Sequence, residues 1–290
     1  MHATMIGVLA HFTKPGAREL VREFCADLAT RSMPFVVDPE TAAHSDLASN
    51  AARDDDAFLI QSRIVVVMGG DGTILRFVHR MGARMLPVFG INLGSLGFLT
   101  CLGPSEIARA ADALQREDYT LSQRRLLKIE HVTGDGECLI SHALNDVVIS
   151  RGERSQLVRI EVRVDGETLT TYNADGLILA TPTGSTAYSL SAGGPILLPD
   201  CGAALITPIC PHVLTNRSTV VSDRSLIEVL LREPDQQVFY NVDGQKSQEM
   251  QIGDRLCVSK SDRVLPLAML PERPFTDVLR QKLKWTGSNI

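Results

Sequence analysis

The stretch Ile64-Val65-Val66-Val67-Met68-Gly69-Gly70-Asp71-Gly72-Thr73 runs from a continuous apolar segment into a glycine-rich turn. Uninterrupted runs of valine and isoleucine are typical of strands in a parallel sheet that helices cover on both faces. The three glycines permit a tight backbone turn after such a strand. The stretch therefore predicts a buried strand, a turn and the start of a helix.

Segments of the same kind surround this stretch. Apolar residues recur at helical spacing between Ala17 and Leu28, after a short apolar run near the start of the chain. The alternation of strand-like and helix-like segments predicts a Rossmann-like α/β domain with a mostly parallel sheet over residues 1–120. Its other strands are predicted at residues 5–9, 34–37 and 86–91.

The pattern changes after residue 120. Short alternating segments follow one another, and Asp-Gly pairs at 135–136, 165–166 and 243–244 indicate hairpins. We expect an all-β, sandwich-like domain over residues 121–272. A helix within residues 273–290 is predicted to pack back on the first domain. The strands of the second domain are expected near residues 127–132, 143–149, 157–164, 168–172 and 177–181.

Composition limits the classes of function. Of the 290 residues, 44% are hydrophobic and 22% charged, which indicates a packed globular protein. The net charge of −5 favours neither nucleic acid nor an anionic membrane as a partner. The sequence shows neither a membrane-spanning run nor a signal-like basic start, and its six cysteines lack C-x-x-C spacing. We therefore expect a cytoplasmic protein with reduced thiols.

The glycine turn suits a phosphate group. Glycines let a ligand approach the backbone, and the amides at a helix start attract anions. The turn matches neither a Walker A loop nor the G-x-G-x-x-G fingerprint. Asp71 would repel phosphate unless it acts beside Mg²⁺ or accepts a proton, and both fit phosphoryl transfer. A simple turn, in which Asp71 or Thr73 only caps the helix, stays open at this point.

This Gly-Gly-Asp-Gly-Thr turn resembles the signature shared by NAD kinases, diacylglycerol and sphingosine kinases and, more distantly, phosphofructokinases. The resemblance implies ATP phosphate binding by Gly69, Gly70, Gly72 and Thr73. It makes Asp71 the catalytic base, and Asp71 and Gly72 also contacts of NAD. The acceptor is not fixed by this turn alone, because a lipid kinase would share it.

Two further segments favour a nucleotide acceptor. Asn92 to Leu99 resembles the Asn-x-Gly-x-x-Gly-Phe element of NAD kinases, in which Phe98 lines the adenosine; a core phenylalanine explains it equally well. Asn145 and Asp146 stand side by side at the start of an apolar strand. By resemblance Asn145 binds adenine and Asp146 accepts hydrogen bonds from ribose hydroxyls, although a hydrogen-bonded core pair is the alternative.

The most specific segment is residues 173–195, which closely resembles the Asp-Gly-x(5)-Pro-Thr-Gly-Ser-Thr-Ala-Tyr-Ser block of NAD kinases. The resemblance places Asp175 near the nicotinamide. Asn173 departs from the arginine of many proteobacterial relatives, at a position associated with choosing NAD over NADH. Gln245, in the late Asp-Gly element, is either a nucleotide contact or part of a plain hairpin. The block also contributes NAD-binding residues Thr186, Ala187, Tyr188, Ser189, Leu190 and Ser191.

Taken together, the resemblance covers nearly the whole chain and implies an NAD kinase of the bacterial family. The expected reaction transfers the γ-phosphoryl group of ATP to the 2′-hydroxyl of the adenosine ribose of NAD. Mg²⁺ or another divalent cation is expected to bind through the phosphates, without a dedicated protein metal site. A homodimer or homotetramer is implied. The alternatives are a lipid or other small-molecule kinase and a non-catalytic NAD(P)-binding regulator.

Overall fold

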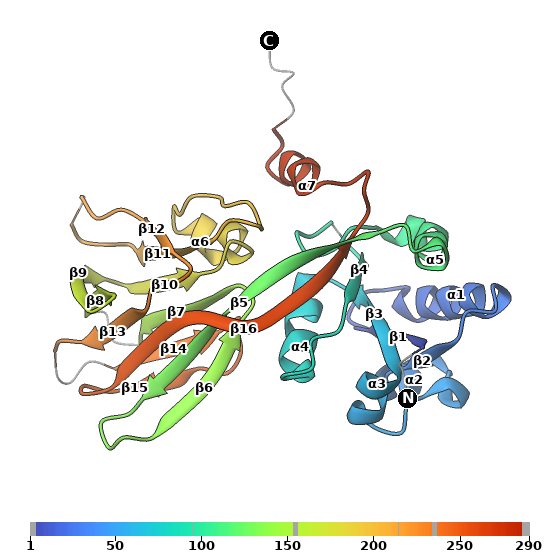
Figure 1. Cartoon of the computed structure of the whole chain (residues 1–290), viewed down its shortest axis with the longest axis horizontal. Helices are drawn as coiled ribbons and strands as arrows, with labels where there is room; N and C mark the ends of the chain where they lie inside the picture. The colour runs from blue at the N-terminus through green and yellow to red at the C-terminus, as the bar shows by residue number, and fades with distance from the viewer. Residues whose placement is uncertain (1–3, 95, 153–155, 214, 234–236, 286–290) are drawn as a thin grey trace, which may run out of the picture. The chain divides into compact units, whose positions relative to one another are not determined.

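A computed structural model describes residues 4–94, 96–152, 156–213, 215–233 and 237–285 of the chain. The chain divides into two compact units, of which the first contains residues 1–123 and 265–290 and the second residues 124–264 (Figure 1). The sequence placed these boundaries at 120 and 272. The return to the first unit comes earlier because the strand β16 (Arg255–Met269) pairs through Leu267 with Val88 of the first sheet.

The first unit is built on a parallel sheet with strand order β2-β1-β3-β4-β16. The predicted strands and helix are all present, with ends shifted by a few residues. The strands are β1 (Met5–Ala10), β2 (Phe35–Val37), β3 (Ser62–Gly69) and β4 (Val88–Asn92). The helices are α1 (Ala17–Thr30), α2 (Pro39–Ser45), α3 (Asp55–Gln61), α4 (Asp71–Met81), α5 (Ile107–Arg116) and α7 (Phe275–Lys282), with short 3₁₀ turns η1 (Ala48–Asn50) and η2 (Pro104–Glu106).

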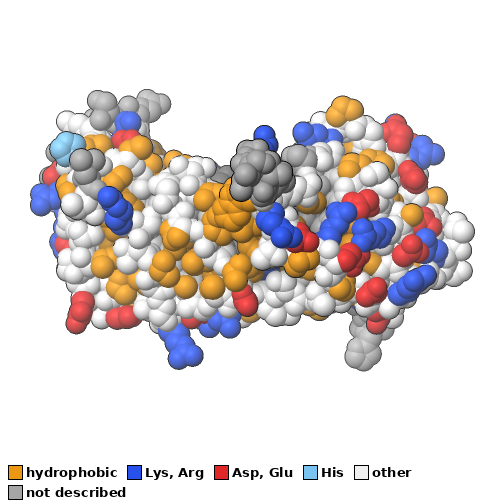
Figure 2. All heavy atoms as spheres, turned by 90° about the horizontal axis from the view of Figure 1, so that it is seen from above, with side chains coloured by type: hydrophobic (Ala, Val, Ile, Leu, Met, Phe, Trp, Pro, Cys, Tyr) orange, Lys and Arg blue, Asp and Glu red, His pale blue; other side chains and the backbone are white. Residues whose placement is uncertain are grey.

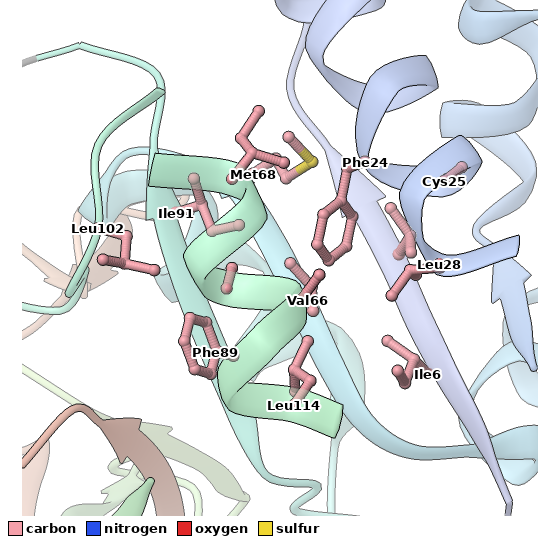
Figure 3. Close-up of a cluster of buried hydrophobic side chains, with 14 of the residues drawn as sticks. Ile6, Phe24, Cys25, Leu28, Val66, Met68, Phe89, Ile91, Leu102 and Leu114 are labelled. Carbon is pink, nitrogen blue, oxygen red and sulfur yellow. The ribbon is translucent and has the colours of Figure 1, made fainter. Parts of the chain in front are cut away.

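Helices cover the two faces of this sheet because its central strand is apolar on both. Val66 of β3 belongs to a buried cluster with Phe24 of α1 and Leu114 of α5 (Figure 3). The neighbouring Val65 and Val67 point to the other face, since side chains of a strand alternate. On that side Phe58 of α3 meets Phe77 of α4 edge to face. The central strand is thus buried from Ile64 to Gly69, as its continuous valine run predicts.

The second unit consists of two antiparallel sheets around one core. Leu179 of one sheet and Ile160 of the other belong to the same buried cluster, so the predicted sandwich-like domain is confirmed. One sheet has the order β12-β11-β10-β7-β14-β15, with β7 (Asp146–Arg151), β10 (Gly176–Ala180), β11 (Ala203–Ile209), β12 (Thr219–Ser222), β14 (Val238–Val242) and β15 (Gln248–Met250). The other contains β5 (Thr120–Val132), β6 (Cys138–Ala143), β8 (Val158–Val164), β9 (Glu167–Ala174), β13 (Ile227–Leu231) and part of β16.

The hairpin predictions hold, but one expected strand divides. Asp165 and Asp243 each adopt a left-handed backbone, with φ of 53° and 50°, and are followed by glycines with positive φ. This is the turn for which Asp-Gly is the preferred pair. Residues 143–149, expected as one strand, belong to two: β6 ends at Ala143 and β7 begins at Asp146. The interruption leaves Leu144 and Asn145 free to make the contacts described below.

The surface carries charges of both signs. On the face shown in Figure 2, acidic and basic side chains are interspersed, in keeping with the small net charge of −5. Among the described residues, no helix is long and apolar enough to cross a membrane.

Candidate active site

A cavity of about 250 Å³ lies at the carboxyl ends of the parallel strands of the first unit. The loops after β1, β3 and β4 supply most of its lining, and α7 adds the rest. Open α/β sheets bind their ligands at this end. The lining includes His11, Lys14, Gly70, Asp71, Gly94 and Lys282.

The glycines of the turn fall into two kinds. A side chain at Gly69 would collide with Thr73, so packing within the chain explains that glycine. Gly70 and Gly72 have negative φ, and an added Cβ at either would meet nothing within 4 Å. Among the described residues, the amides of Asp71 and Gly72 have no hydrogen-bond partner. The first turn of α4 thus offers unpaired donors beside open space, the arrangement that an anion needs.

Asp71 ties the glycine turn to the loop after β4. Its Oδ2 accepts a hydrogen bond from the amide of Phe98 (2.8 Å), and its Oδ1 accepts one from the amide of Leu99 (3.1 Å). An added Cβ at Gly97 would overlap this carboxylate, which explains the glycine there. Asp71 does not cap α4: the N-cap is Gly70, whose amide donates to the Thr73 hydroxyl (3.4 Å). Each Asp71 oxygen keeps acceptor capacity for another donor.

Two lysines that the sequence did not single out line the same cavity. Lys14 lies over Gly94, where an added Cβ would be 3.7 Å from its Cε. Lys282 comes from the far end of the chain, through α7. Both side chains are exposed, and ammonium groups beside a phosphate site serve as counter-charges. Residue patterns near the glycine turn gave no sign of either, because the contacts join segments distant in sequence.

Phe98 is half-buried rather than part of the core. Its ring lies 6.1 Å from the ring of Phe275, in a tilted arrangement. The loop that carries Phe98 is fixed by Asn92, whose Oδ1 accepts the amide hydrogen of Gly94 (2.6 Å). The Thr100 hydroxyl in turn accepts a hydrogen bond from the amide of Gly97 (2.9 Å). The Phe98 ring therefore keeps a partly open face on an ordered loop.

In the second unit, the Asn145-Asp146 pair lies against the Pro-Thr-Gly turn, as the resemblance implies for residues of one site. The amide of Thr181 donates to the Asn145 carbonyl (2.8 Å), and the Thr181 hydroxyl donates to the Leu144 carbonyl (2.6 Å). An added Cβ at Gly184 would collide with the Asn145 backbone. The glycine is therefore required for the close approach of the two segments.

Asp243 holds the same segment from the other side, a role the sequence did not reveal. Its carboxylate accepts hydrogen bonds from three successive amides, those of Leu144 (2.8 Å), Asn145 (2.7 Å) and Asp146 (3.0 Å). Gln245 is exposed, and its amide closes the hairpin turn onto Val242 (2.9 Å). The Asp-Gly element is thus a hairpin whose aspartate also orders the residues before β7.

Asp243 binds the backbone amide of Asp146 but leaves its carboxyl group unpaired. Asp146 is 5% exposed, and its side chain makes no hydrogen bond to any described residue. Burial, and next the charge of Asp243, raise the pKa of Asp146 to about 7. A buried carboxyl group without a partner is costly, and perturbed groups of this kind cluster at functional sites. The Asp146 side chain can therefore accept hydrogen bonds from a ligand.

The hydroxyl-rich turn after β10 has an inward and an outward side. Ser189 is fully buried, and its hydroxyl pairs with that of Thr207 (3.0 Å). Tyr188 is 46% exposed and Ser191 is exposed, so their side chains can reach a ligand directly. Thr186 is intermediate and donates to the carbonyl of Thr183 (3.2 Å). Two more residues are partly exposed: Ala187, between η3 (Gly184–Thr186) and α6 (Tyr188–Ser191), and Leu190 of α6.

Asp175 is paired, but with a residue not considered from the sequence. It lies at the bend between β9 and β10, where its Oδ1 accepts from Nε of Arg151 at 2.7 Å. Both side chains are about one-third exposed. Asn173 is exposed near the end of β9, and its carbonyl accepts from the amide of His212 (2.9 Å). Arg151 thus supplies a cation beside Asp175 in a chain that has asparagine at position 173.

The three hydrogen bonds that the Asp243 carboxylate accepts, called the Asp243 clamp, give a stability prediction. In Asp243→Asn the amide oxygen can keep two of the three backbone donors, whereas the NH₂ group faces the third, so one buried amide loses its acceptor. We expect the free energy of unfolding to fall by about 2 kcal/mol in urea denaturation at pH 5. The exposed Asp135→Asn, in the β5–β6 turn, is the control. Equal, small losses in both variants would show that Asp243 is not a clamp.

Sequence comparison agrees with both halves of this geometry. Residues 6–119 match the family model of the ATP-NAD kinase N-terminal domain, and residues 144–270 match that of the ATP-NAD kinase C-terminal domain. The chain belongs to the NAD kinase family. The predicted family, two-domain fold and kinase function are thereby confirmed.

Individual members of the NAD kinase family are similar over their full length. The NAD kinase of Geotalea daltonii is 40% identical over 97% of this chain and 98% of its own, and that of Solibacter usitatus is 38% identical over 96% of each. A crystal structure of yeast NADH kinase complexed with NADH has a TM-score of 0.88 at 28% identity, covering 100% of this chain and 89% of its own. An NAD kinase from Archaeoglobus fulgidus, in complex with ATP, shares the fold with a TM-score of 0.73 at 24% identity, covering 97% and 99%.

Proposed function

We propose that the chain transfers the γ-phosphoryl group of ATP to the 2′-hydroxyl of the adenosine ribose of NAD, giving NADP. One observation carries the proposal most directly: Asp71 is held at a glycine turn beside two amides that have no partner among the described residues. Donors beside open space bind transferable phosphate, and a fixed carboxylate can accept the proton of the attacking hydroxyl. Family membership supports the choice of NAD as the acceptor.

In this proposal the first unit binds the donor. The amides of Asp71 and Gly72 bind phosphate oxygens, with Gly69, Gly70 and Thr73 shaping the turn and Lys14 and Lys282 balancing the charge. Asp71 accepts the proton of the 2′-hydroxyl, a role that contributes on the order of 10² to 10⁴ in rate. Positioning and charge neutralisation supply most of the remaining acceleration.

The second unit binds the acceptor. The Asp146 carboxylate accepts hydrogen bonds from ribose hydroxyls, because it is buried and has no side-chain hydrogen-bond partner among the described residues. Asn145 binds the adenine, and Tyr188 offers an exposed ring to the adenosine. The nucleotide is lined by Thr186, Ala187, Leu190 and Ser191. The buried Ser189 stabilises the turn through its hydrogen bond with Thr207. Phe98, with one open face, is proposed to line the adenosine as well, and Gln245 is proposed as a peripheral contact.

A divalent cation, Mg²⁺ above all, is proposed to accompany ATP. Among the described residues no group of three or more His, Cys, Asp or Glu side chains is arranged to hold a metal. In the part of the chain that the structure describes, Asp71 is the one carboxylate that lines the cavity of about 250 Å³ at the glycine turn, called the phosphate cavity below. These residues fit an ion held mainly by phosphate oxygens, without a dedicated set of protein ligands. The bound cation would neutralise charge on the phosphates.

Purified protein assayed for NADP formation tests the proposal. We expect NADP to appear from NAD and ATP with a divalent cation present, and to be absent with a chelator. Diacylglycerol and sphingosine should not stimulate ATP consumption. Consumption of ATP with a lipid, and none with NAD, would favour the lipid-kinase alternative; binding of NAD without turnover would favour a regulator. A cytoplasmic homodimer or homotetramer is proposed on the family resemblance.

The Arg151–Asp175 pair gives a prediction about the redox state of the acceptor. If Asp175 lies near the nicotinamide, Arg151 offsets its charge and weakens any preference for the positively charged ring of NAD. We therefore expect measurable phosphorylation of NADH, and a threefold to tenfold rise, roughly, in the NAD/NADH ratio of kcat/KM in Arg151→Gln. Arg159→Gln, an exposed variant of the same unit, is the control. An unchanged ratio in Arg151→Gln would place Asp175 away from the nicotinamide.

A further inference from the structure

A second cavity of the first unit adjoins the phosphate cavity. It has a volume of about 200 Å³ and shares His11 with the phosphate cavity. One face of α4 connects the two: Thr73, Arg76, Phe77 and Arg80 follow one another at helical spacing and all line the second cavity. A ligand whose phosphates bind at the first turn of α4 can therefore extend along this helix.

Part of the wall of the second cavity is formed by charged side chains that are already paired with other residues. The buried Asp38 caps α2 by accepting from the amide (3.0 Å) and hydroxyl (2.9 Å) of Thr41. Its other oxygen accepts from Arg80, which also pairs with Asp55 at 2.7 Å. The two carboxylates hold the helices, whereas Arg80 uses only Nη2 for these pairs, and its buried Nε has no hydrogen-bond partner among the described residues. The floor is apolar, since Leu9 is 7% and Phe77 1% exposed.

Two opposite charges on the rim are not committed. Arg76 and Glu40 line the cavity and are exposed, and their side chains have no hydrogen-bond or ion-pair partner among the described residues. Both lie near enough to His11 to affect its pKa, which burial lowers, Arg76 lowers further and Glu40 raises. An apolar floor with a free guanidinium and a free carboxylate suits a nucleoside. Bases stack on guanidinium planes and apolar side chains, and their amines and ribose hydroxyls donate to carboxylates.

We propose that this second cavity binds the nucleoside of the phosphoryl donor, with Arg76 against the base and Glu40 accepting hydrogen bonds from it or from the ribose. The inference rests on the proposed function for the identity of the donor. It makes Arg76 and Glu40 residues that determine nucleotide affinity. They do not take part in the transfer.

Two ligands separate this site from the phosphate cavity. Adenylyl imidodiphosphate, a non-hydrolysable ATP analogue, should occupy both cavities, whereas inorganic pyrophosphate should occupy only the first. We expect Arg76→Ala and Glu40→Gln each to weaken binding of the analogue by about tenfold in calorimetry with Mg²⁺. Binding of pyrophosphate should change less than twofold. The controls are Arg22→Ala and Glu23→Gln, which remove exposed charges of α1 outside both cavities.

Turnover provides an independent measure. With NAD saturating, the KM for ATP should rise in both rim variants, while the KM for NAD and the midpoint of thermal unfolding stay as in the parent. If binding of the analogue and of pyrophosphate weakened equally, Arg76 would act on the phosphates through its charge at a distance and would not contact the base. If binding of the analogue were unchanged, the nucleoside would bind elsewhere. Either result would overturn the inference while NADP formation continued, whereas failure of the proposed function would appear as no NADP in the parent.

Discussion

Asp71→Asn is expected to lower kcat for NADP formation by at least about a hundredfold. The asparagine side chain cannot take the proton of the 2′-hydroxyl, and general-base catalysis is typically worth 10² to 10⁴ in rate. It also keeps only one of the two hydrogen bonds to the amides of Phe98 and Leu99, since its NH₂ group faces the other amide. Steady-state kinetics with NAD and ATP varied separately measure the effect on kcat and on each KM.

A loosened loop alone must be distinguished from a lost base. Thr100→Val provides this control, because it removes the hydroxyl that accepts from the amide of Gly97 without touching Asp71. Thr100 is 1% exposed and valine has nearly its shape. We expect this variant to lose less than about tenfold in kcat. If Thr100→Val falls as far as Asp71→Asn, Asp71 acts by ordering the loop, and another group takes the proton.

Local patterns predicted the framework of both units well. The valine run of β3 is buried because helices cover both faces, and the Asp-Gly pairs at 165–166 and 243–244 adopt left-handed turns. These features depend on neighbours in sequence, so periodicity and turn chemistry reveal them. The division between β6 and β7 was missed, since the apolar residues continue through Leu144. The interruption comes from Asp243, which binds the amides of this segment from a distant hairpin.

The candidate site was predictable as far as its motifs reach. Each motif is one continuous stretch of sequence, so each could be recognised by itself. The motifs are the glycine turn, the Asn145-Asp146 pair and the hydroxyl-rich block. Lys14 and Lys282 could not be recognised, because they approach the phosphate cavity from the loop after β1 and from α7. The pairing of Arg151 with Asp175 was missed for the same reason. Residues that complete a site from other segments carry no local signature.

Ionisation of the buried Asp146 lowers the stability of the second unit at neutral pH. Its folded pKa of about 7 lies well above the ordinary value of 3.8, because burial and Asp243 disfavour the charged form. Folding therefore takes up a proton between about pH 4 and pH 7, and the free energy of unfolding falls as the pH rises through this range. The contribution is fully present below pH 3.8 and lost above pH 7. Sites of this kind commonly trade stability for function.

We therefore expect Asp146→Asn to be more stable than the parent at pH 8, by on the order of 2–4 kcal/mol, and nearly equal to it at pH 4. The asparagine is neutral throughout, so it avoids the cost of ionisation beside Asp243. Urea denaturation of both proteins from pH 4 to pH 8 measures the difference. The exposed variant Glu137→Gln should follow the parent within about 0.5 kcal/mol. A stability difference that does not grow with pH would show that Asp146 ionises normally in the folded protein.

The same substitution is expected to impair NAD binding. An ionised carboxylate can accept two ribose hydroxyl bonds, each worth roughly 1.5–3 kcal/mol, and the asparagine oxygen retains one of them. We expect the Kd for NAD in Asp146→Asn to rise by about tenfold to a hundredfold at pH 8. In the parent the Kd should rise as the pH falls below about 7, where Asp146 takes up its proton, and the variant should lack this dependence. Calorimetry at pH 6 and pH 8 gives both comparisons. A more stable variant that binds NAD as tightly as the parent would remove Asp146 from the nucleotide site while leaving its buried charge intact as a structural feature.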